Sequence, residues 1–227
     1  MAVFDPIVRR LVVRVVYDGP AFAGKTTNVQ RITELVPVSK RTELYTPGAL
    51  KGRTMFFDWL EIDGGKLGGM DVRVQILSVP GQAQRSYRRR PLLMSADTVV
   101  FVADSTGTGL DESKRSYDLL RRYLRERDAE IPVLVQANKQ DCEGAHPPET
   151  VVESLHKRKE LPVIGASAHA GHGVRETLQS AMKMAIRDVK ERVAREGVAN
   201  ITGAIQTADG LFEELLEIEE KFLMGEV

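Results

Sequence analysis

The sequence GPAFAGKT at residues 19–26 fits the pattern G-x-x-x-x-G-K-T and directly follows the apolar run LVVRVVY at residues 11–17. In a phosphate-binding loop, a buried strand aims the loop and the N-terminus of the next helix receives the phosphate. A helix that begins at Lys25 or Thr26 completes this arrangement. The alternative is a glycine-containing turn with a chance lysine, which we disfavour because strand, spacing and Gly-Lys-Thr all agree. The stretch therefore predicts an α/β fold built around a phosphate-binding loop.

The residues of this loop have separate expected roles. Its backbone N–H groups are expected to cradle the β-phosphate, while the Lys25 ammonium reaches the β and γ oxygens. The Thr26 hydroxyl is expected to ligate Mg²⁺. The candidate nucleotide-binding residues in the loop and the first helical turn are Gly19, Ala21, Ala23, Gly24, Lys25, Thr26 and Thr27.

Apolar runs that predict strands alternate with helical patterns along the chain, which favours a doubly wound, mostly parallel sheet. The glycine-rich residues 63–69 lie between two strand-like runs and predict one antiparallel hairpin. The expected strands are residues 11–17, 54–62, 71–78, 98–103, 131–136 and 161–166. The expected helices are residues 25–36, 111–127, 149–158 and 174–196.

Composition narrows the class of protein. The 227 residues carry equal numbers of basic and acidic side chains, so the net charge is zero, which argues against nucleic-acid binding through a basic surface. The single cysteine, Cys142, indicates a reducing compartment. No apolar run approaches the ~20 residues of a membrane span, and neither a signal-peptide core nor a lipidation site is found. We expect a cytoplasmic protein without a membrane anchor of its own.

A second motif indicates which nucleotide base is bound. The sequence Asn138-Lys139-Gln140-Asp141 follows the apolar run at residues 131–135. The Asp141 carboxylate can accept hydrogen bonds from N1–H and N2–H₂ of guanine, whereas adenine lacks both donors. The stem of Lys139 can lie over the ring, and Asn138 can tie loops together. A further base-binding loop is expected at Ser167, Ala168 and His169. The predicted ligand is therefore GTP or GDP with Mg²⁺.

Two further segments are expected to respond to the γ-phosphate. The Gly81 N–H can contact it and Gln82 can orient the attacking water, directly after the strand that ends at Ser78. Thr54 ends the polar, turn-rich segment 37–53 and can close on Mg²⁺ and the γ-phosphate. Loss of that phosphate would release both segments, as in an order–disorder switch.

These elements together resemble the small Ras-like GTPases, and most closely the bacterial MglA family of gliding-motility and cell-polarity GTPases. The similarity covers roughly residues 10–196. It is carried by Tyr17-Asp18-Gly19-Pro20, Gly24-Lys25-Thr26-Thr27-Asn28, Arg53-Thr54-Met55-Phe56-Phe57-Asp58, Val79-Pro80-Gly81-Gln82 and Val100-Phe101-Val102-Ala103-Asp104-Ser105.

The resemblance implies an intrinsic arginine finger at Arg53, which would act beside the catalytic Gln82. It also implies a Roadblock-fold GTPase-activating partner similar to MglB, motility or polarity effectors, and a polar location reached through protein partners. Most Ras-like proteins carry aspartate where Ser78 stands, while MglA-like proteins have a small hydroxyl residue there. Because Ser78 stands in place of that aspartate, the Mg²⁺ site lacks a carboxylate that would hydrogen-bond to the ligands of the metal. Our hypothesis is that Asp58 supplies that charge through water; an ordinary aspartate at a strand end is the equal alternative.

Ala21 is a second departure, because the resemblance implies glycine there. A Cβ would intrude where Gln82 and Arg53 gather, and a misplacement of ~1 Å can lower a rate on the order of 100-fold. Ala21 therefore predicts slow hydrolysis or insensitivity to an activator. The alternatives are an engineered substitution that locks the GTP state and a small loop shift that accommodates the methyl group.

The GTPase domain is expected at residues 1–197 and an acidic amphipathic helical extension at residues 198–227. The extension is expected either to dock on its own domain or to contact another protein. The arginines that follow Gln82, at positions 85, 88, 89 and 90, favour a solvated basic helix face over a partner surface.

The sequence as a whole predicts a GTP-hydrolysing switch. The main alternative is a hydrolysis-deficient GTP-binding scaffold that acts through its C-terminal helix. A small-metabolite kinase is disfavoured because Asn-Lys-x-Asp would have no role in it, and an adaptor without nucleotide is disfavoured by the intact Lys25-Thr26 pair.

Overall fold

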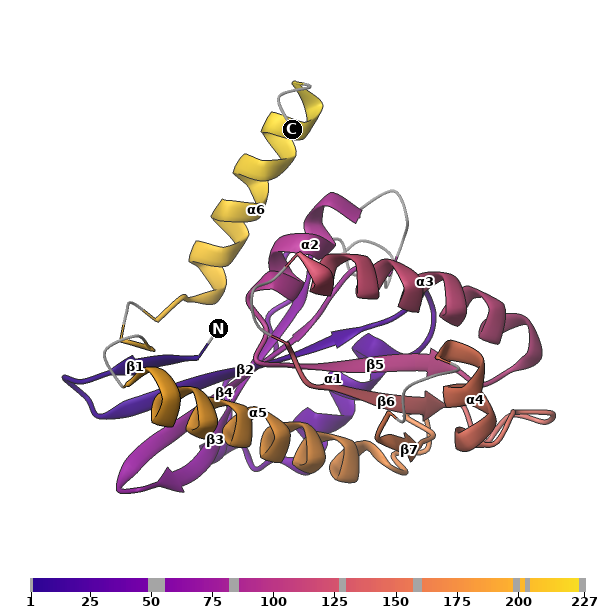
Figure 1. Ribbon diagram of the computed structural model, residues 1–227, viewed down its shortest axis with the longest axis horizontal. Coiled ribbons are helices and arrows are strands. Elements are labelled where there is room, and N and C mark those ends of the chain that lie inside the picture. The colour runs from indigo at the N-terminus through magenta and orange to yellow at the C-terminus, as the bar shows by residue number, and fades with distance from the viewer. Residues whose placement is uncertain are drawn as a thin grey trace.

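A mostly parallel β-sheet lies at the centre of the computed structural model (Figure 1). The structure describes residues 2–48, 56–81, 86–126, 130–156, 161–197, 201–202 and 205–224. Within these residues the sheet has seven strands in the order β3-β4-β2-β5-β6-β7, and β1 pairs with β2. The strands are β1 (Val3–Asp5), β2 (Arg10–Asp18), β3 (Asp58–Leu67), β4 (Met70–Ser78), β5 (Thr98–Asp104), β6 (Val133–Asn138) and β7 (Val163–Gly165).

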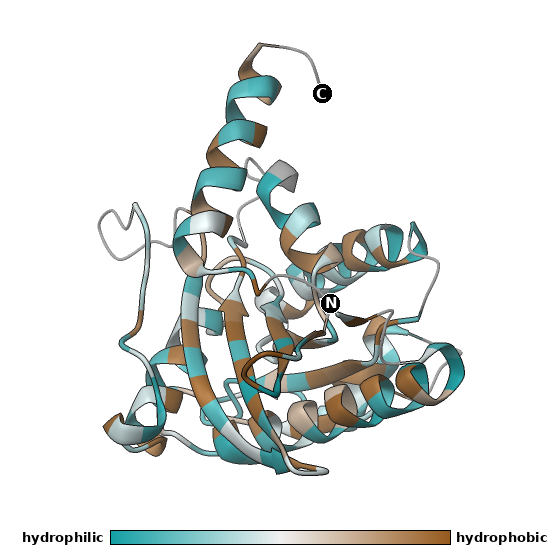
Figure 2. Ribbon diagram, turned by 90° about the vertical axis from the view of Figure 1, so that its left-hand side faces the viewer, coloured by the Kyte–Doolittle hydropathy of each residue, from teal (hydrophilic) through white to brown (hydrophobic). Residues whose placement is uncertain are grey.

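Helices cover both faces of this sheet (Figures 1 and 2). They are α1 (Lys25–Leu35), α2 (Ser86–Met94), α3 (Gly107–Arg125), α4 (Pro148–Leu155), α5 (Val174–Glu196) and α6 (Ala208–Leu223), with a 3-10 helix η1 (Val38–Lys40). Alternate residues of β2 serve the two faces, as expected for a buried strand. Val13 and Val15 pack in the core that contains the buried side of α1 and α5, while Val16 packs in the core that contains α2, α3 and α4.

The predicted fold class is confirmed. The chain forms a Ras-like α/β domain in which β3 and β4 are the antiparallel hairpin and a helical extension follows α5. The expected helix at 174–196 matches α5 residue for residue, and the expected strands at 11–17, 71–78 and 98–103 each lie inside an observed strand.

The hairpin differs from the sequence prediction. The predicted strand begins at residue 54, whereas β3 begins at Asp58. Phe56 does not join the sheet because its ring packs against Phe212 of α6. The strand then continues through the first glycines to Leu67, with an irregularity between Asp63 and Lys66. The turn itself is Gly68-Gly69, where both φ angles are positive (56° and 80°), a conformation that favours glycine.

The first strand, β1, was not expected from the sequence. It adds a second antiparallel pairing beside Arg10–Val12, at the end of β2 that β5 does not reach. The buried Asp97 carboxylate joins the two parts of this edge by accepting hydrogen bonds from the backbone N–H of Ala2 (2.6 Å) and of Arg14 (2.9 Å). A three-residue strand has too short a pattern to be recognised, and its pairing is not local in sequence.

Candidate functional site

The phosphate-loop residues lie between the C-terminal end of β2 and the first turn of α1, as the motif predicts. Glycine is required at both ends of the loop. Gly19 has φ 143°, and a Cβ there would lie 2.2 Å from the carbonyl oxygen of Val102. Gly24 has φ 102°, and a Cβ there would lie 2.3 Å from the side-chain nitrogen of Asn138. The neighbouring strands therefore fix the path of the loop.

Lys25 is held inside the loop. Its Nζ donates to the carbonyl oxygens of Gly19 (3.0 Å) and Pro20 (2.6 Å), and the side chain is buried. Burial lowers the pKa of Lys25 to about 8, and the nearby Arg89 acts in the same direction, while Asp18 and Asp58 oppose the shift. A bound anion would stabilise this buried ammonium, because it would replace the water that the ammonium has lost.

Asp58 gathers hydroxyl groups from three directions. Its Oδ2 accepts from Thr26 Oγ1 (2.6 Å) and from the Ser78 hydroxyl, and its Oδ1 accepts from Thr46 Oγ1 (3.0 Å). The Asp58 side chain is fully buried. Because the Thr26 hydroxyl is the donor in its hydrogen bond to Asp58, the lone pairs of the Thr26 oxygen stay available to a cation.

This cluster suits a hard cation. All its side-chain groups are oxygen donors, which Mg²⁺ prefers, and Mg²⁺ usually takes one or two protein ligands and completes its shell with phosphate and water. Among the described residues no group of three or more His, Cys, Asp or Glu side chains is placed to hold a metal ion by itself. The residues present therefore fit a metal that is shared with a bound phosphate.

Gly81 lies directly against the phosphate loop. A Cβ at this position would lie 2.5 Å from Lys25 Nζ and 2.6 Å from the backbone nitrogen of Ala21. The preceding strand is held in place because the Val79 N–H donates to the carbonyl of Tyr17 (3.0 Å). The structure thus brings Gly81, Ala21 and Lys25 together. The expected Arg53, Thr54 and Gln82 lie outside the described residues.

Asn138 connects three loops. Its Nδ2 donates to the carbonyl of Ala23 (2.7 Å), and its Oδ1 accepts from the backbone N–H of Ala168 (2.9 Å). Lys139 has a positive φ of 67°, and its ammonium pairs with the Asp104 carboxylate, which sets the direction of its stem. These contacts hold the second motif, at the end of β6, beside the phosphate loop.

Asp141 remains available as a charged acceptor. A hydrogen bond from the Ser167 hydroxyl is the main cause that lowers the pKa of the Asp141 carboxyl. The Ser167 side chain is buried, and its backbone pairs with His172 in both directions at 3.0 Å. The His169 side chain is exposed, while its backbone carbonyl accepts from Arg31 (2.5 Å). The loop at 167–169 therefore lies next to the Asp141 side chain.

The sequence analysis missed a buried amide network below the site. Asn28 and Gln136 exchange hydrogen bonds of 2.7 Å and 2.9 Å, and Gln136 also donates to Thr177 Oγ1 (2.9 Å). These three side chains join α1, β6 and α5 and are fully buried. The signal was the polar Gln136, which interrupts the apolar part of the strand VLVQAN before Asn138. This network fixes the position of α1, which begins at the phosphate loop, relative to β6, which ends at Asn138 of the base motif.

The interpretation of the arginine run as a solvated face is wrong for Arg88 and Arg89, which are each 4% exposed. Arg89 donates to Asp18 Oδ2 (2.6 Å) and to the backbone of Ser116 (3.0 Å), so it ties α2 to the residue before Gly19. Only Arg90 follows the expectation: it is exposed and pairs with Glu126. Position 85 lies outside the described residues. The acidic partners come from distant parts of the chain, so local sequence could not reveal them.

Comparison with known proteins gives a consistent result. The model of the ADP-ribosylation factor (Arf) family matches residues 9–185. The mutual gliding-motility protein MglA of Myxococcus xanthus (strain DK1622) is 33% identical over 186 residues, which are 81% of this chain and 95% of that protein. ADP-ribosylation factor-like protein 2 of Arabidopsis thaliana is 36% identical over 110 residues, 45% of this chain and 58% of that protein.

Among solved structures, the Arl6 BBS3 small GTPase from Trypanosoma brucei with the bound nucleotide analogue GppNp superposes with a TM-score of 0.59. It is 23% identical and covers 78% of this chain and 99% of its own, so it supports the fold. Within the part of the chain that the structure describes, no helix has the length and apolar character to cross a membrane.

Proposed function

The chain belongs to the ADP-ribosylation factor family of small GTPases, and from that membership we propose that it is a nucleotide-dependent switch of the MglA type. It is a Ras-like P-loop protein whose cofactors are GTP or GDP and Mg²⁺. The observation that supports the switch best is the convergence of Lys25, Gly81 and Asp58 around one loop. Through Asp58 and Gly81, the two segments that are expected to respond to the γ-phosphate would both detect the same phosphate group.

In the proposed reaction a water oxygen attacks the γ-phosphorus, the bond to the bridging oxygen breaks, and GDP and phosphate leave. Gln82 orients the water, while Lys25 and Arg53 stabilise the charge that develops on the phosphate oxygens. Thr26 and Thr54 would hold Mg²⁺, with Asp58 behind them, and the metal would neutralise charge on the phosphates. Gly81, the residue before Gln82, lies against the loop.

The name of the bacterial relative motivates the proposed pathway. MglA of M. xanthus is described as a mutual gliding-motility protein, and we extend a role in cell polarity or motility to this chain. A Roadblock-fold activator similar to MglB and a polar location reached through effectors complete the proposal. Loss of polar localisation of motility proteins in a deletion strain is the expected cellular result; their unchanged location would contradict this part.

The second candidate function is a GTP-binding scaffold that scarcely hydrolyses. Two observations favour it: Ala21 stands beside Gly81, and a helical extension covers the neighbouring α2. Both candidates bind the same nucleotide, so the rate of hydrolysis separates them.

Replacing Ala21 by glycine is expected to accelerate single-turnover GTP hydrolysis by about tenfold or more, because the backbone near Gly81 gains room for Gln82 and Arg53. Hydrolysis of bound GTP in the two proteins at one Mg²⁺ concentration measures this. Equal, measurable rates would show that the loop accommodates the methyl group, and the chain would then be an ordinary cycling switch. A protein that retains no guanine nucleotide would overturn both candidates.

Replacing Asp58 by alanine is expected to raise the Mg²⁺ concentration needed to retain GDP by about 10-fold to 100-fold, as for other residues that orient metal ligands. The buried carboxylate orients the Thr26 and Ser78 hydroxyls and supplies negative charge near the metal. GDP release is followed by fluorescence during Mg²⁺ titration. The exposed Asp63, mutated to alanine, is the matched control, and Asp58→Asn separates charge from shape. An unchanged Mg²⁺ dependence in Asp58→Ala contradicts the role.

Binding of GDP at about pH 9 is expected to take up nearly one proton. Burial holds the pKa of Lys25 at about 8 in the free protein, so most of this side chain is neutral at pH 9. The phosphate anion raises the pKa again, and the ammonium re-forms. Below about pH 7 the group is charged in both states, so the uptake should vanish. Calorimetry in two buffers of different ionisation enthalpy measures the proton count. Lys25→Arg, which stays charged, should show no uptake.

A further inference from the structure

The C-terminal helix α6 lies beyond the part of the chain that matches the Arf family, which ends at residue 185. It is nevertheless built into the core of the domain. Leu211 and Leu215 are 2% and 0% exposed, and they pack in the same apolar cluster as Phe56, Trp59 and Leu92. Figure 1 shows that α6 passes beside α2 and then projects away from the domain. The extension therefore docks on its own chain, and Leu211 and Leu215 bury the N-terminal half of the helix.

Three contacts define where α6 sits. The rings of Phe56 and Phe212 meet edge to face, with centroids 4.8 Å apart. The Arg88 guanidinium lies over the Phe56 ring, 3.9 Å from its centroid, and donates to the Glu219 carboxylate. Burial raises the pKa of Tyr45, and a hydrogen bond between its hydroxyl and Asp209 raises it further. We call the surface formed by Tyr45, Phe56 and Arg88 the α6 surface.

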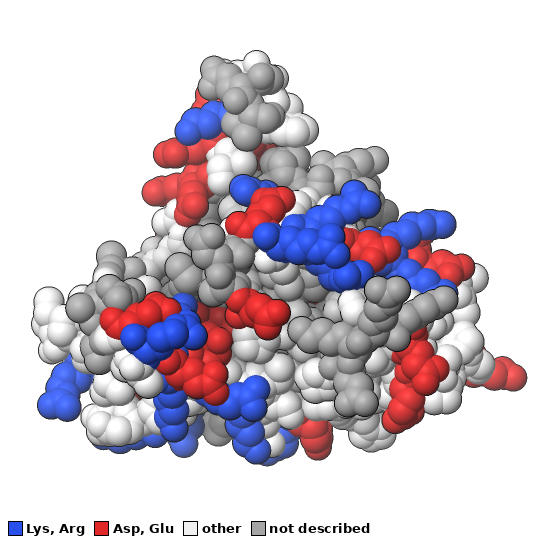
Figure 3. All heavy atoms as spheres, in the orientation of Figure 1, with Lys and Arg blue, Asp and Glu red and all other residues white. Residues whose placement is uncertain are grey.

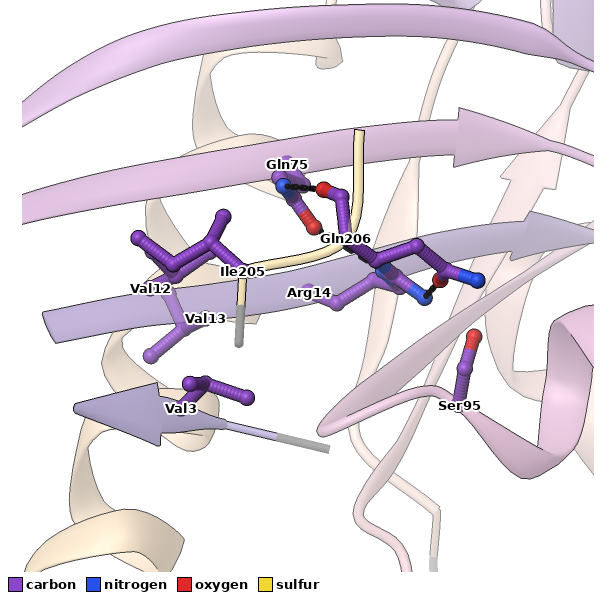
Figure 4. A pocket seen from close by; sticks show the side chains of 8 residues that line it. All are labelled: Val3, Val12, Val13, Arg14, Gln75, Ser95, Ile205 and Gln206. Atoms are coloured by element: carbon purple, nitrogen blue, oxygen red, sulfur yellow. Dashed lines mark hydrogen bonds between the residues drawn. The ribbon is translucent and has the colours of Figure 1, made fainter. Parts of the chain in front are cut away.

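The segment that leads into α6 is fastened separately (Figure 4). Arg14 Nη1 donates to the Gln206 side chain (2.8 Å), and Gln75 donates to the Gln206 carbonyl (2.9 Å). Thr207 then caps the helix by accepting from the Gly210 N–H (3.1 Å). These residues line or adjoin a cavity of about 200 Å³ between β2, β4 and the leading segment. The helix thus keeps its tether even when its docked face leaves the surface.

The α6 surface is formed by the flanks of the two segments expected to respond to nucleotide. Phe56 is two residues after Thr54, and Arg88 is six residues after Gln82. A rearrangement of either segment that extends to Phe56 or Arg88 would disturb the contacts to Phe212 and Glu219. Docking of α6 and the arrangement of these segments are therefore linked, and by thermodynamic reciprocity each biases the other.

The chemistry of α6 indicates what this surface binds. Its docked residues are apolar at positions 211, 212 and 215 and acidic at position 219, which lie on one side of a helix. Figure 3 shows acidic side chains gathered along the projecting helix. On the docked side of the helix, Glu219 meets the Arg88 cation and Phe212 meets the Phe56 ring. The surface and the helix are thus complementary in both apolar contact and charge.

We propose that the α6 surface is a docking site for an acidic amphipathic helix, and that α6 is the occupant which a partner protein's helix of the same chemistry must displace. A tethered helix has an effective concentration in the millimolar range, so it excludes a micromolar competitor until its docking is weakened. Weakening by the nucleotide state rests on the switch proposed above; the docking itself does not.

The test uses the full chain and a fluorescent peptide of residues 205–224. The variant Phe212→Ala with Glu219→Lys removes the contacts of α6 to Phe56 and Arg88 and leaves the surface residues themselves unchanged. We expect it to bind the peptide at least tenfold more tightly than the unmodified chain does. The matched control is Glu213→Ala with Glu217→Lys, which changes exposed residues of the same helix. Equal peptide affinity in all three proteins would overturn the proposal, and Glu219→Lys alone replaces the double variant should that fail to fold.

A charge exchange tests the location of binding. Adding Arg88→Glu to the variant should abolish binding of the peptide, and a peptide carrying Glu219→Arg should restore it. Binding that ignores both changes would place the peptide elsewhere and contradict the proposal. Peptide affinity with GDP and with a non-hydrolysable GTP analogue should differ at least threefold. Equal values would overturn the nucleotide linkage alone. Retention of labelled GDP in the same samples reports separately on the proposed switch.

Discussion

Replacing Asp141 by asparagine is expected to lower the affinity for GDP by about 100-fold to 1000-fold. The ionised carboxylate can accept from N1–H and N2–H₂ of guanine, and the Ser167 hydroxyl helps to keep it ionised. An amide keeps one acceptor and turns an N–H₂ group toward the base amino group. Loss of one charge-assisted bond and weakening of the other amounts to about 3–4 kcal/mol, which corresponds to this loss of affinity.

The same substitution should favour xanthine. This base carries an oxygen in place of the amino group at C2, so the new amide can donate to it. Competition of GDP and xanthosine diphosphate against a fluorescent nucleotide measures both affinities. Cys142→Ser, at the exposed neighbouring position, is the matched control and should leave both unchanged. A GDP affinity that survives Asp141→Asn, or an equal loss for both nucleotides, would contradict base recognition by Asp141.

Replacing Gln82 or Arg53 by alanine is expected to slow single-turnover GTP hydrolysis by about 100-fold to 1000-fold, with nucleotide affinity changed by less than about threefold. Both side chains are assigned to the transition state, where they orient water and stabilise charge, and such groups contribute several kcal/mol to the rate and little to binding. Rapid mixing of loaded protein with Mg²⁺, followed by phosphate release, measures the rate.

Lys51→Ala is the matched control for Arg53, because it removes a positive charge two positions away in the same segment. Hydrolysis in this control should stay within about threefold of the unmodified chain. If Lys51→Ala slows the reaction as much as Arg53→Ala does, the effect is a general one of positive charge, and the assignment of Arg53 is wrong. A rate that survives Gln82→Ala would contradict the role of Gln82 in the same way.

The phosphate and base motifs could be read from sequence because each combines a local pattern with an apolar strand. A side chain at position 19 would meet the Val102 backbone, and one at position 24 would meet the Asn138 side chain, which itself donates to the Ala23 carbonyl. Helix α3 begins at Gly107, earlier than expected, and Asp104 lies so close to Gly109 that a Cβ there would be 2.1 Å from the carboxyl carbon. Local information failed where the deciding contact is remote.

The helix α2 shows the same limit. Its sequence SYRRRPLLM contains an internal proline and three consecutive arginines, a pattern that does not predict a docked helix. The two buried arginines pair with remote acidic residues: Arg89 with Asp18, 71 residues earlier, and Arg88 with Glu219, 131 residues later. The start of α6 at Ala208 likewise depends on the Thr207 cap and on Gln206, which is held by Arg14. Sequence reasoning placed the acidic helix but could not choose its docking surface.

The uneven attachment of α6 has a consequence for backbone amide exchange. Its first half is anchored by Gln206 and by the buried Leu211 and Leu215, whereas Phe222 and Leu223 are 47% and 77% exposed. A helix held at one end opens stepwise from the other, because fewer contacts oppose fraying there. Deuterium should therefore enter the last turn first, and the turn around Leu211 should exchange only when the whole helix leaves the domain. The exchange rates of successive turns would therefore report how far the helix has opened, with each turn exchanging before the turn that precedes it in the chain.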